Sequence, residues 1–429
     1  MKKSITYSIV SEQFSLSNDR VLRNGNGDSL AALTHALQAC EGDDKLFYES
    51  RTSDHHKRLW NRLVDETIEA KKEFASPLQL AIHGMVQSEV KFDVPFPPPL
   101  EPKFRFIDLF AGIGGVRLAF QRLDGKCVFS SEIDPFAKRT YAANFGEVPF
   151  GDITQIDEDD VPDHDILVGG FPCQAFSIAG KRLGFEETRG TLFFDIARIL
   201  QLKRPSAIFL ENVKGLMNHR GGETLRVILK VLREDLGYHV PDPQIVNAKY
   251  FGVPQNRERV FIVGFRDPDA AEQFTYPAQK EVTKSIADIL EVEAVASKYY
   301  LSERYLQSMR EHRRRHEALG HGFGYEIIPH DSVANAIVVG GMGRERNLLI
   351  DDRLVDRTPT TNIVGEINHE FVRKMTPREW ARLQGYPEEF RIVVSDAQAY
   401  KQFGNSVAVP AVAAVAKTMV RILHGKEQR

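Results

Sequence analysis

The sequence predicts an α/β fold in which helices cover a parallel sheet and a second, smaller domain interrupts the chain. Between residues 104 and 265, short β-branched and aromatic runs alternate with helical patterns, which is typical of βα units. The alternation fades between residues 267 and 372. An apolar run at 407–423 then predicts a buried helix closed by Gly425. These observations indicate one sheet domain with an insertion before its last helix.

The strands are expected where apolar runs end in polar or glycine-rich loops. We predict five of them, at 104–110, 126–131, 165–170, 206–211 and 259–265. Residues 1–100 contain helical stretches near 28–40 and 55–86 and end in a proline cluster that predicts a stiff linker. We therefore expect a helical extension with its linker over 1–100, a sheet domain over 101–266 plus 390–429, and an inserted domain over 267–389.

Composition excludes several classes of protein. The chain has 429 residues, 42% of them hydrophobic, with 56 Lys and Arg against 59 Asp and Glu. A net charge of -3 excludes a globally basic coat protein, so any nucleic-acid surface must be local. Three cysteines, Cys40, Cys127 and Cys173, are too few for a disulfide framework or a cysteine-rich zinc site. Without an apolar run of about 18 residues, we expect a cytoplasmic protein with no membrane partner and no metal.

The first predicted strand leads into a glycine-rich turn that contains Gly112, Gly114 and Gly115. Glycines let a backbone approach a ligand at a helix N-terminus. A dinucleotide fingerprint would need a glycine where Arg117 stands, which counts against NAD. Glu132, at the end of the next strand, can accept hydrogen bonds from ribose hydroxyls. The pattern favours an adenosine-type cofactor, and the alternative is a plain tight turn with a solvated strand end.

Cys173 follows the predicted strand at 165–170, at the sheet edge where open α/β proteins bind ligands. An ionised thiol is a strong nucleophile, although a single cysteine is more often a small buried side chain. The next strand delivers Glu211 and Asn212 to the same edge. A thiol beside a carboxyl that can be protonated suits attack on an electron-poor ring, because one group adds and the other protonates the ring nitrogen.

Arg257 and Arg259 stand at alternating positions and are expected to project to one side of a strand. Guanidinium groups are suited to fixing a phosphate or a base carbonyl. The alternative for this segment is a solvated edge on which Glu258 forms a salt bridge.

Taken together, these blocks resemble the DNA (cytosine-5)-methyltransferases, most closely their Dcm-like bacterial branch. The resemblance covers about 104–265 and 372–423 and rests on five blocks, at 110–115, 172–174, 211–213, 255–259 and 402–407. It implies a Rossmann-like S-adenosylmethionine-dependent methyltransferase sheet with a smaller inserted target-recognition domain. It also implies a monomer that methylates cytosine in a specific double-stranded DNA sequence. Such an enzyme would guard host DNA in a restriction–modification system with a cognate endonuclease.

The resemblance implies catalytic roles for four residues. Cys173 would add to C6 of a flipped-out cytosine, Glu211 would hold and protonate N3, and Arg257 and Arg259 would fix the base and its phosphates. Attack at C6 activates the otherwise inert C5, and the base must leave the duplex for this to happen.

The cofactor site implied by the resemblance places Phe110 on adenine, Glu132 on the ribose and Asp152 on the adenine amine. The other cofactor-binding residues that it implies are Gly112, Gly114, Pro172, Asn405, Ser406 and Val407. Two positions depart from the family pattern: Ala175 replaces a usual proline, which would loosen the catalytic loop, and Trp380 stands where cysteine is common.

DNA contacts are expected from the loop after Cys173 and from the insertion. The loop at 175–188 is the expected lid, and it brings Gln174 and Ser177 to the DNA. In the insertion, an arginine-rich stretch at 304–316 and a glycine-rich loop at 340–347 are candidates for reading the target sequence. We single out Arg313, Arg314, Arg344 and Arg346; for the first two, a solvated helix face or phosphate contact alone remains open.

Two rival functions stay open beside DNA methylation. One is a catalytically silent DNA-binding regulator, which the Cys173 and Glu211 pair disfavours. The other is methylation of cytosine in tRNA, which the long insertion disfavours. For residues 1–100, an autoregulatory helix-turn-helix and a plain structural extension are both compatible with the sequence.

Overall fold

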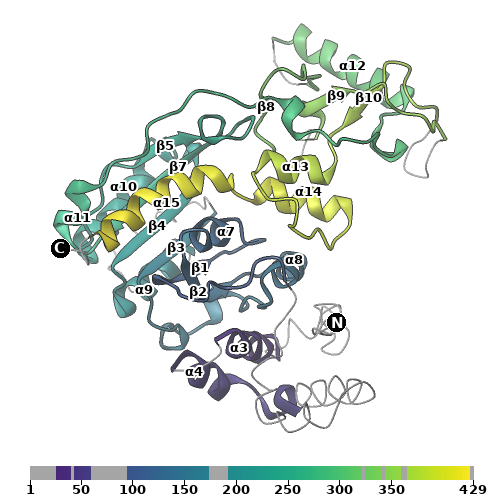
Figure 1. The fold of residues 1–429 in the computed structure, drawn as a ribbon. Coiled ribbons are helices and arrows are strands. Elements are labelled where there is room, and N and C mark those ends of the chain that lie inside the picture. The colour runs from purple at the N-terminus through teal and green to yellow at the C-terminus, as the bar shows by residue number, and fades with distance from the viewer. Residues whose placement is uncertain are drawn as a thin grey trace.

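A six-stranded sheet forms the centre of the molecule (Figure 1). The computed structural model describes residues 26–39, 43–58, 94–172, 192–320, 324–339, 344–358 and 365–425. The strand order is β2-β1-β3-β4-β7-β5. The strands are β1 (Phe104–Leu109), β2 (Gly125–Ser131), β3 (Ile166–Gly170), β4 (Ala207–Val213), β5 (Gln244–Asn247) and β7 (Glu258–Phe265). All five predicted strands are therefore confirmed.

The predicted α/β sheet is confirmed, and it is parallel except at one edge. Strands β1 to β4 are parallel, whereas β7 pairs antiparallel with both β4 and β5. The sequence did not reveal β5, because Gln244–Asn247 is short and half polar. The four parallel strands still end at the same edge, which is where ligands bind in open α/β sheets.

Helices cover both faces of the sheet, as Figure 1 shows. One hydrophobic cluster joins α7 (Gly115–Gln121), α8 (Pro135–Phe145) and α15 (Val409–His424) to one face. A second cluster joins α9 (Leu192–Lys203) and α10 (Glu223–Lys230) to the other. The alternation of side chains along each strand separates the two clusters.

The last helix, α15, confirms the buried helix predicted near the C-terminus. Gly425 follows it as the C-cap residue. By length and composition alone, the segment Asp396–His424 could cross a membrane. It consists of two helices, α14 (Asp396–Asn405) and α15, and α15 buries Val412, Val415 and Met419 in the core of the sheet domain. The burial of one apolar face is what a core helix requires.

The insertion between β7 and α15 has small hydrophobic clusters of its own. Its main elements are α11 (Pro268–Gln273), α12 (Glu303–Ala318), β9 (Leu348–Ile350) and β10 (Val372–Lys374), and β8 (Ala334–Asn335) pairs with β6 (Gln255–Asn256). One cluster contains Leu301, Leu306, Met309, Leu348 and Val372. By contrast, α11 and α13 (Pro377–Leu383) both contribute residues to the large cluster of the sheet. The domain limits at 266/267 and 389/390 remain predictions, and these contacts favour placing α13 with the sheet domain.

The N-terminal helices α3 (Asn26–Ala39) and α4 (Asp43–Arg51) pack against the sheet domain near β2 (Figure 1). The helix predicted near 28–40 is confirmed. Of the stretch predicted at 55–86, only residues up to 58 belong to the described part of the chain, and these are helical.

Candidate active site

The glycine-rich turn directly follows β1. Phe110, Gly112 and Gly114 adopt φ angles of 59°, 55° and 85°, which explains the preference for glycine here. A Cβ atom at Gly114 would lie 2.2 Å from the ring of Phe145. A Cβ atom at Gly112 would meet no heavy atom within 4 Å. Gly114 thus allows close packing, whereas Gly112 borders open space that a ligand can occupy.

Glu132 holds this turn in place from the end of β2. Its Oε2 accepts a hydrogen bond from the backbone N–H of Gly112 at 2.8 Å, and its Oε1 accepts one from Asp134 at 2.7 Å. Burial raises the pKa of Glu132, and these backbone N–H groups oppose that rise. The predicted ribose-binding carboxylate therefore lies against the predicted cofactor turn.

The segment between α14 and α15 completes the same cavity. Six of the nine residues predicted to bind the cofactor line it together, namely Phe110, Gly112, Glu132, Asn405, Ser406 and Val407. Gly114 packs beneath the turn, and Asp152 caps a short 3-10 helix by accepting a hydrogen bond from Thr154 N at 3.0 Å. Pro172 is exposed at the end of a described segment. The structure thus brings six of the nine residues together and leaves three at the periphery.

Sequence reasoning missed an ion pair that borders this cavity. Lys401 Nζ lies 2.6 Å from Asp134 Oδ2, and both residues line the cavity. Partial burial acts to raise the pKa of Asp134, but hydrogen bonds from Lys401 and from the first turn of α8 lower it overall. Because the two residues are far apart in sequence, no local pattern could have revealed the pair.

Glu211 lines the same cavity from β4 and is 8% exposed. Its Oε1 lies 3.0 Å from Arg259 Nε. Burial raises the pKa of Glu211, and the charges of Arg259 and Arg257 oppose the rise. A buried carboxyl of this kind can hold a proton and donate it. Arg259 and Glu211, each predicted separately as a catalytic residue, are therefore paired beside this cavity, and the sequence did not predict their contact.

The backbone next to Glu211 leads towards Cys173. Gly170 is paired with Glu211 across β3 and β4, and a Cβ atom at Gly170 would lie 3.6 Å from Glu211 Oε2. Asn212 Nδ2 donates a hydrogen bond to the carbonyl of Phe171 at 2.8 Å. This bond fixes the chain two residues before Cys173. Cys173 itself, like Gln174 and Ser177, lies outside the described residues, so its contact with Glu211 stays a prediction.

Arg257 differs from Arg259 in its surroundings. Its side chain is buried, and Nη1 donates to the carbonyl of Ile337 at 2.8 Å while Nη2 donates to those of Gly404, at 3.2 Å, and Ser406. Burial, followed by the charge of Arg259, lowers the pKa of Arg257 to about 9. Arg257 is thus bound to the backbone next to this cavity, and its contact with the base or a phosphate stays a prediction.

Two buried glutamines extend this network. Gln255 donates to the carbonyl of Leu383 at 2.8 Å and accepts from the backbone N–H of Ile337 at 3.1 Å. Gln384 donates to the carbonyl of Phe403 at 2.8 Å. The network joins the insertion, through Ile337, to the segment that contains Ser406. A glutamine in a sequence gives no signal for such a role.

The predicted DNA-reading arginines lie on the insertion with mixed surroundings. Arg313 on α12 forms an ion pair with Glu317 at 2.8 Å, and the guanidinium carbon of Arg344 lies 5.4 Å from the ring centroid of Tyr400. Arg314 and Arg346 are exposed. The contact with Glu317 favours a solvated helix face for Arg313, and a DNA contact of any of the four stays a prediction.

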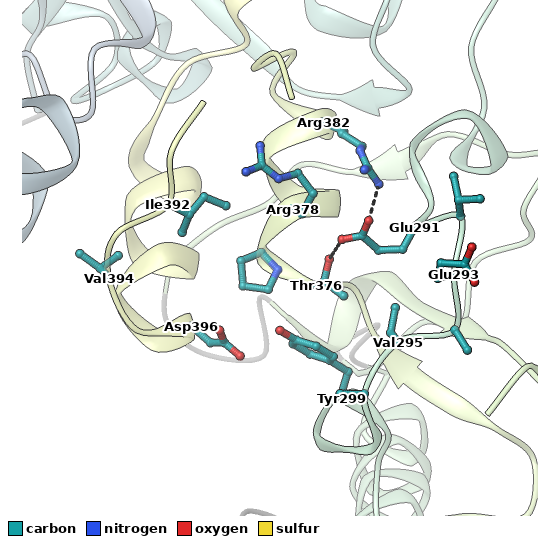
Figure 2. Close-up of a pocket in the computed structure, with 14 residues that line it drawn as sticks. Glu291, Glu293, Val295, Tyr299, Thr376, Arg378, Arg382, Ile392, Val394 and Asp396 are labelled. Atoms are coloured by element: carbon teal, nitrogen blue, oxygen red, sulfur yellow. Dashed lines mark hydrogen bonds and ion pairs between the residues drawn. The ribbon is translucent and has the colours of Figure 1, made fainter. Parts of the chain in front are cut away.

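A second cavity lies between the insertion and the chain that follows it (Figure 2). Residues 291–296 form one wall, and the start of α13 with Ile392, Val394 and Asp396 forms the other. Glu291 joins the walls, because it accepts a hydrogen bond from Thr376 Oγ1 at 3.2 Å and pairs with Arg382 at 3.0 Å. The residues predicted to act in catalysis or to bind the cofactor or DNA do not line this cavity.

Comparison with known proteins agrees with this geometry. The family model of the C-5 cytosine-specific DNA methylases matches residues 104–421. The chain is 63% identical over 329 residues to the type II methyltransferase M.HpaII of Haemophilus parainfluenzae, which covers 76% of this chain and 92% of that protein. It is 48% identical over 352 residues to M1.ScrFI of Lactococcus lactis subsp. cremoris, with 81% and 85% covered. The Dnmt2 methyltransferase of S. pombe shares the fold, with a TM-score of 0.56 and 23% identity over 75% of this chain and 99% of that one.

The α/β sheet and the match to the family model identify the chain as an S-adenosylmethionine-dependent methyltransferase. Within that class, the chain belongs to the C-5 cytosine-specific DNA methylase family. It uses S-adenosylmethionine to methylate cytosine in DNA at C5, and the resemblance inferred from the sequence blocks is confirmed.

Proposed function

We propose that the enzyme methylates a cytosine that has swung out of a specific duplex sequence, through a transient bond between Cys173 Sγ and C6. One observation carries this proposal: Glu211 lines the same cavity as Phe110 and Glu132. A proton donor for the base therefore lies beside the site expected to hold the methyl donor. Such proximity is a large part of enzymatic rate enhancement.

In the proposed reaction, Cys173 is the nucleophile and Glu211 is the proton donor. The Cys173 thiolate adds to C6 while Glu211 gives its proton to N3, which makes C5 nucleophilic. S-Adenosylmethionine, when bound, supplies a methyl group activated by its sulfonium. After C5 has taken the methyl group, C5 loses its proton to a base. N3 returns its proton to Glu211, and elimination of the Cys173 thiolate restores the 5,6 double bond of 5-methylcytosine.

Arg259 supports the proton transfer in this scheme. Its guanidinium lies 3.0 Å from Glu211 and fixes the orientation of the carboxyl. Its positive charge also opposes the rise in the pKa of Glu211 that burial causes. A carboxyl poised between these opposing effects can exchange a proton in both directions.

The cofactor is proposed to lie along the glycine turn. Phe110 would stack on adenine, Glu132 would bind the ribose, and Asn405, Ser406 and Val407 would close the cavity from the C-terminal side. Asp152 remains the proposed partner of the adenine amine, with Gly114 and Pro172 next to the methionine part.

The insertion is proposed to recognise the target sequence, with Gln174 and Ser177 contacting the DNA from the catalytic loop. Because the curated relatives are type II methyltransferases, we place the enzyme in a restriction–modification system beside an endonuclease for the same site. We also propose that it acts as a monomer, since one chain supplies both the cofactor cavity and Glu211.

Transfer of tritiated methyl groups tests this proposal, with double-stranded DNA and tRNA as alternative acceptors. The expected result is transfer to DNA alone, and formation of a covalent complex with DNA that contains 5-fluorocytosine. The variant Cys173→Ser should bind the cofactor but neither transfer methyl groups nor form the complex. Cys127→Ala is the matched control because the Cys127 thiol is buried, and burial raises its pKa to about 12. Methylation by Cys173→Ser would rule out the covalent step.

A further inference from the structure

The segment 147–152 lies between the cofactor site and the N-terminal helices. On the cofactor side, the backbone N–H of Glu132 donates to the carbonyl of Phe150 at 2.9 Å. The backbone N–H of Phe150 donates to the carbonyl of Ser130 at 2.8 Å. The segment thereby continues the edge of β2 and ends at Asp152. The position of this segment therefore sets the positions of two residues proposed to contact adenosine.

On its other side, the same segment is held by α3 and α4. The backbone N–H of Val148 donates to Thr34 Oγ1 at 3.0 Å. The ring of Phe150 packs against the rings of His35 and Tyr48, with centroids 5.3 and 6.1 Å apart. The contacts of α3 thus reach both the backbone and the side chains of the segment.

A buried polar network of His35, Glu147 and Arg117 extends these contacts to α7. His35 Nε2 lies 3.5 Å from Glu147 Oε2, which also lies 2.5 Å from Arg117 Nη1. His35 is 3% exposed, Glu147 2% and Arg117 0%. Burial lowers the pKa of His35, and Glu147 opposes that shift. Arg117 belongs to α7, which starts at the glycine turn. Through Glu147 and Arg117, α3 therefore connects to the glycine turn as well as to segment 147–152.

The burial of α3 distinguishes the roles open to the N-terminal region. Seven consecutive residues, 30–36, are each at most 6% exposed. Buried side chains cannot enter a DNA groove, since base contacts need side chains on an exposed face. Residues 30–36 therefore cannot contact bases in this state of the protein.

We propose that the N-terminal unit, residues 26–39 and 43–58, is a working part of the S-adenosylmethionine site, in which Thr34 and His35 are positioning residues for segment 147–152. This inference rests on the proposed cofactor site. The unit lies before residue 104, where the family match begins, so it adds a support to the shared catalytic fold. Without it, the N–H of Val148 would lose its side-chain acceptor and the ring of Phe150 would lose its contacts with two rings, so the adenosine side of the cavity would lose its fixed position.

The test uses the full-length enzyme and the variants Thr34→Val, His35→Ala and His35→Gln. For Thr34→Val and His35→Ala, we expect the KM and Kd for S-adenosylmethionine to rise on the order of ten-fold, as for the loss of one buried hydrogen bond. The kcat and the KM for DNA should change little. His35→Gln keeps a polar side chain beside Glu147 and should restore most of the cofactor affinity. Thr34→Val is nearly isosteric, so it keeps the test valid should His35→Ala fold poorly.

Leu306→Ala is the control for general destabilisation. Leu306 is fully buried in the insertion and belongs to a cluster separate from the cofactor site. It should lower the Tm without changing the affinity for S-adenosylmethionine. If Thr34→Val and His35→Ala lower only the Tm, or change only the KM for DNA, the inference is wrong. If the wild-type enzyme does not bind S-adenosylmethionine, the proposed cofactor site fails instead, and the two failures are distinguishable.

Discussion

Arg259 Nε lies 3.0 Å from Glu211 Oε1, and this pair joins the end of β4 to the start of β7. Antiparallel pairing of these strands sets Val213 opposite Arg259, so Arg259 reaches back to Glu211 two residues along the neighbouring strand. The carboxyl is thereby fixed in a buried position next to the cofactor cavity.

Glu211→Gln removes the proton donor but keeps the shape of the side chain. We expect kcat to fall by about 10²- to 10⁴-fold, as is typical for the loss of a general acid. Cofactor binding should remain, and calorimetry together with tritiated methyl transfer measures both. Glu258→Gln is the matched control, because Glu258 is partly exposed and pairs with Lys214 at 2.8 Å. Equal losses of activity in the two variants would contradict a specific role for Glu211.

The pH dependence of kcat/KM should show the proton on Glu211. Burial raises the pKa of Glu211, so the protonated form required for catalysis persists to higher pH than for an exposed glutamate. Because Arg259 opposes this rise, Arg259→Met should raise the pKa further. The descending limb of the pH profile of kcat/KM should therefore move to higher pH. A shift to lower pH would show that another group titrates.

Arg257→Met should act mainly on stability and on the cofactor. The substitution removes the Arg257 donor from the carbonyls of Ile337, Gly404 and Ser406, of which Ser406 keeps a bond from Gln384 Nε2 at 3.4 Å. We expect a loss of about 2–4 kcal/mol in the free energy of unfolding, since each unpaired buried carbonyl costs roughly 1–3 kcal/mol and local relaxation recovers part of it. Thermal and urea unfolding measure this loss. A fully stable variant with no activity would instead indicate that Arg257 contacts the nucleotide, as the sequence led us to expect.

Gly115→Ala tests the close approach between the start of α7 and the C-terminal segment. An added Cβ atom would lie 2.5 Å from Tyr386 Oη and 2.9 Å from Val407 Cγ2. We expect a lower Tm and weaker binding of S-adenosylmethionine, because the two walls of the cavity must separate. Gly215→Ala is a suitable control, since its Cβ atom would meet only Val213 Cγ2, at 3.9 Å. Unchanged cofactor affinity in Gly115→Ala would contradict the close contact.

The strands and most of the cofactor cavity could be predicted because their signals are local. Buried parallel strands are apolar runs, and their ends meet at one edge, which is how Glu132 and Glu211 were found. The strand β5 lacks such a run. The alternating positions of Arg257 and Arg259 predict that both side chains project to one side of a strand. They do not predict which groups each guanidinium contacts there. The contacts of Lys401 with Asp134 and of His35 with Glu147 join distant parts of the chain, so only the folded structure shows them.

The bonds of Arg257 also have a thermodynamic consequence. Its guanidinium holds Ile337, in the insertion, and Ser406, at the cofactor cavity. If duplex binding displaces the insertion, the displacement reaches this guanidinium and the wall of the cavity together. We then expect DNA to change the affinity for S-adenosylmethionine, and linkage requires that the cofactor change the affinity for DNA by the same factor. Equilibrium titrations of either ligand, with and without the other, should return one common value.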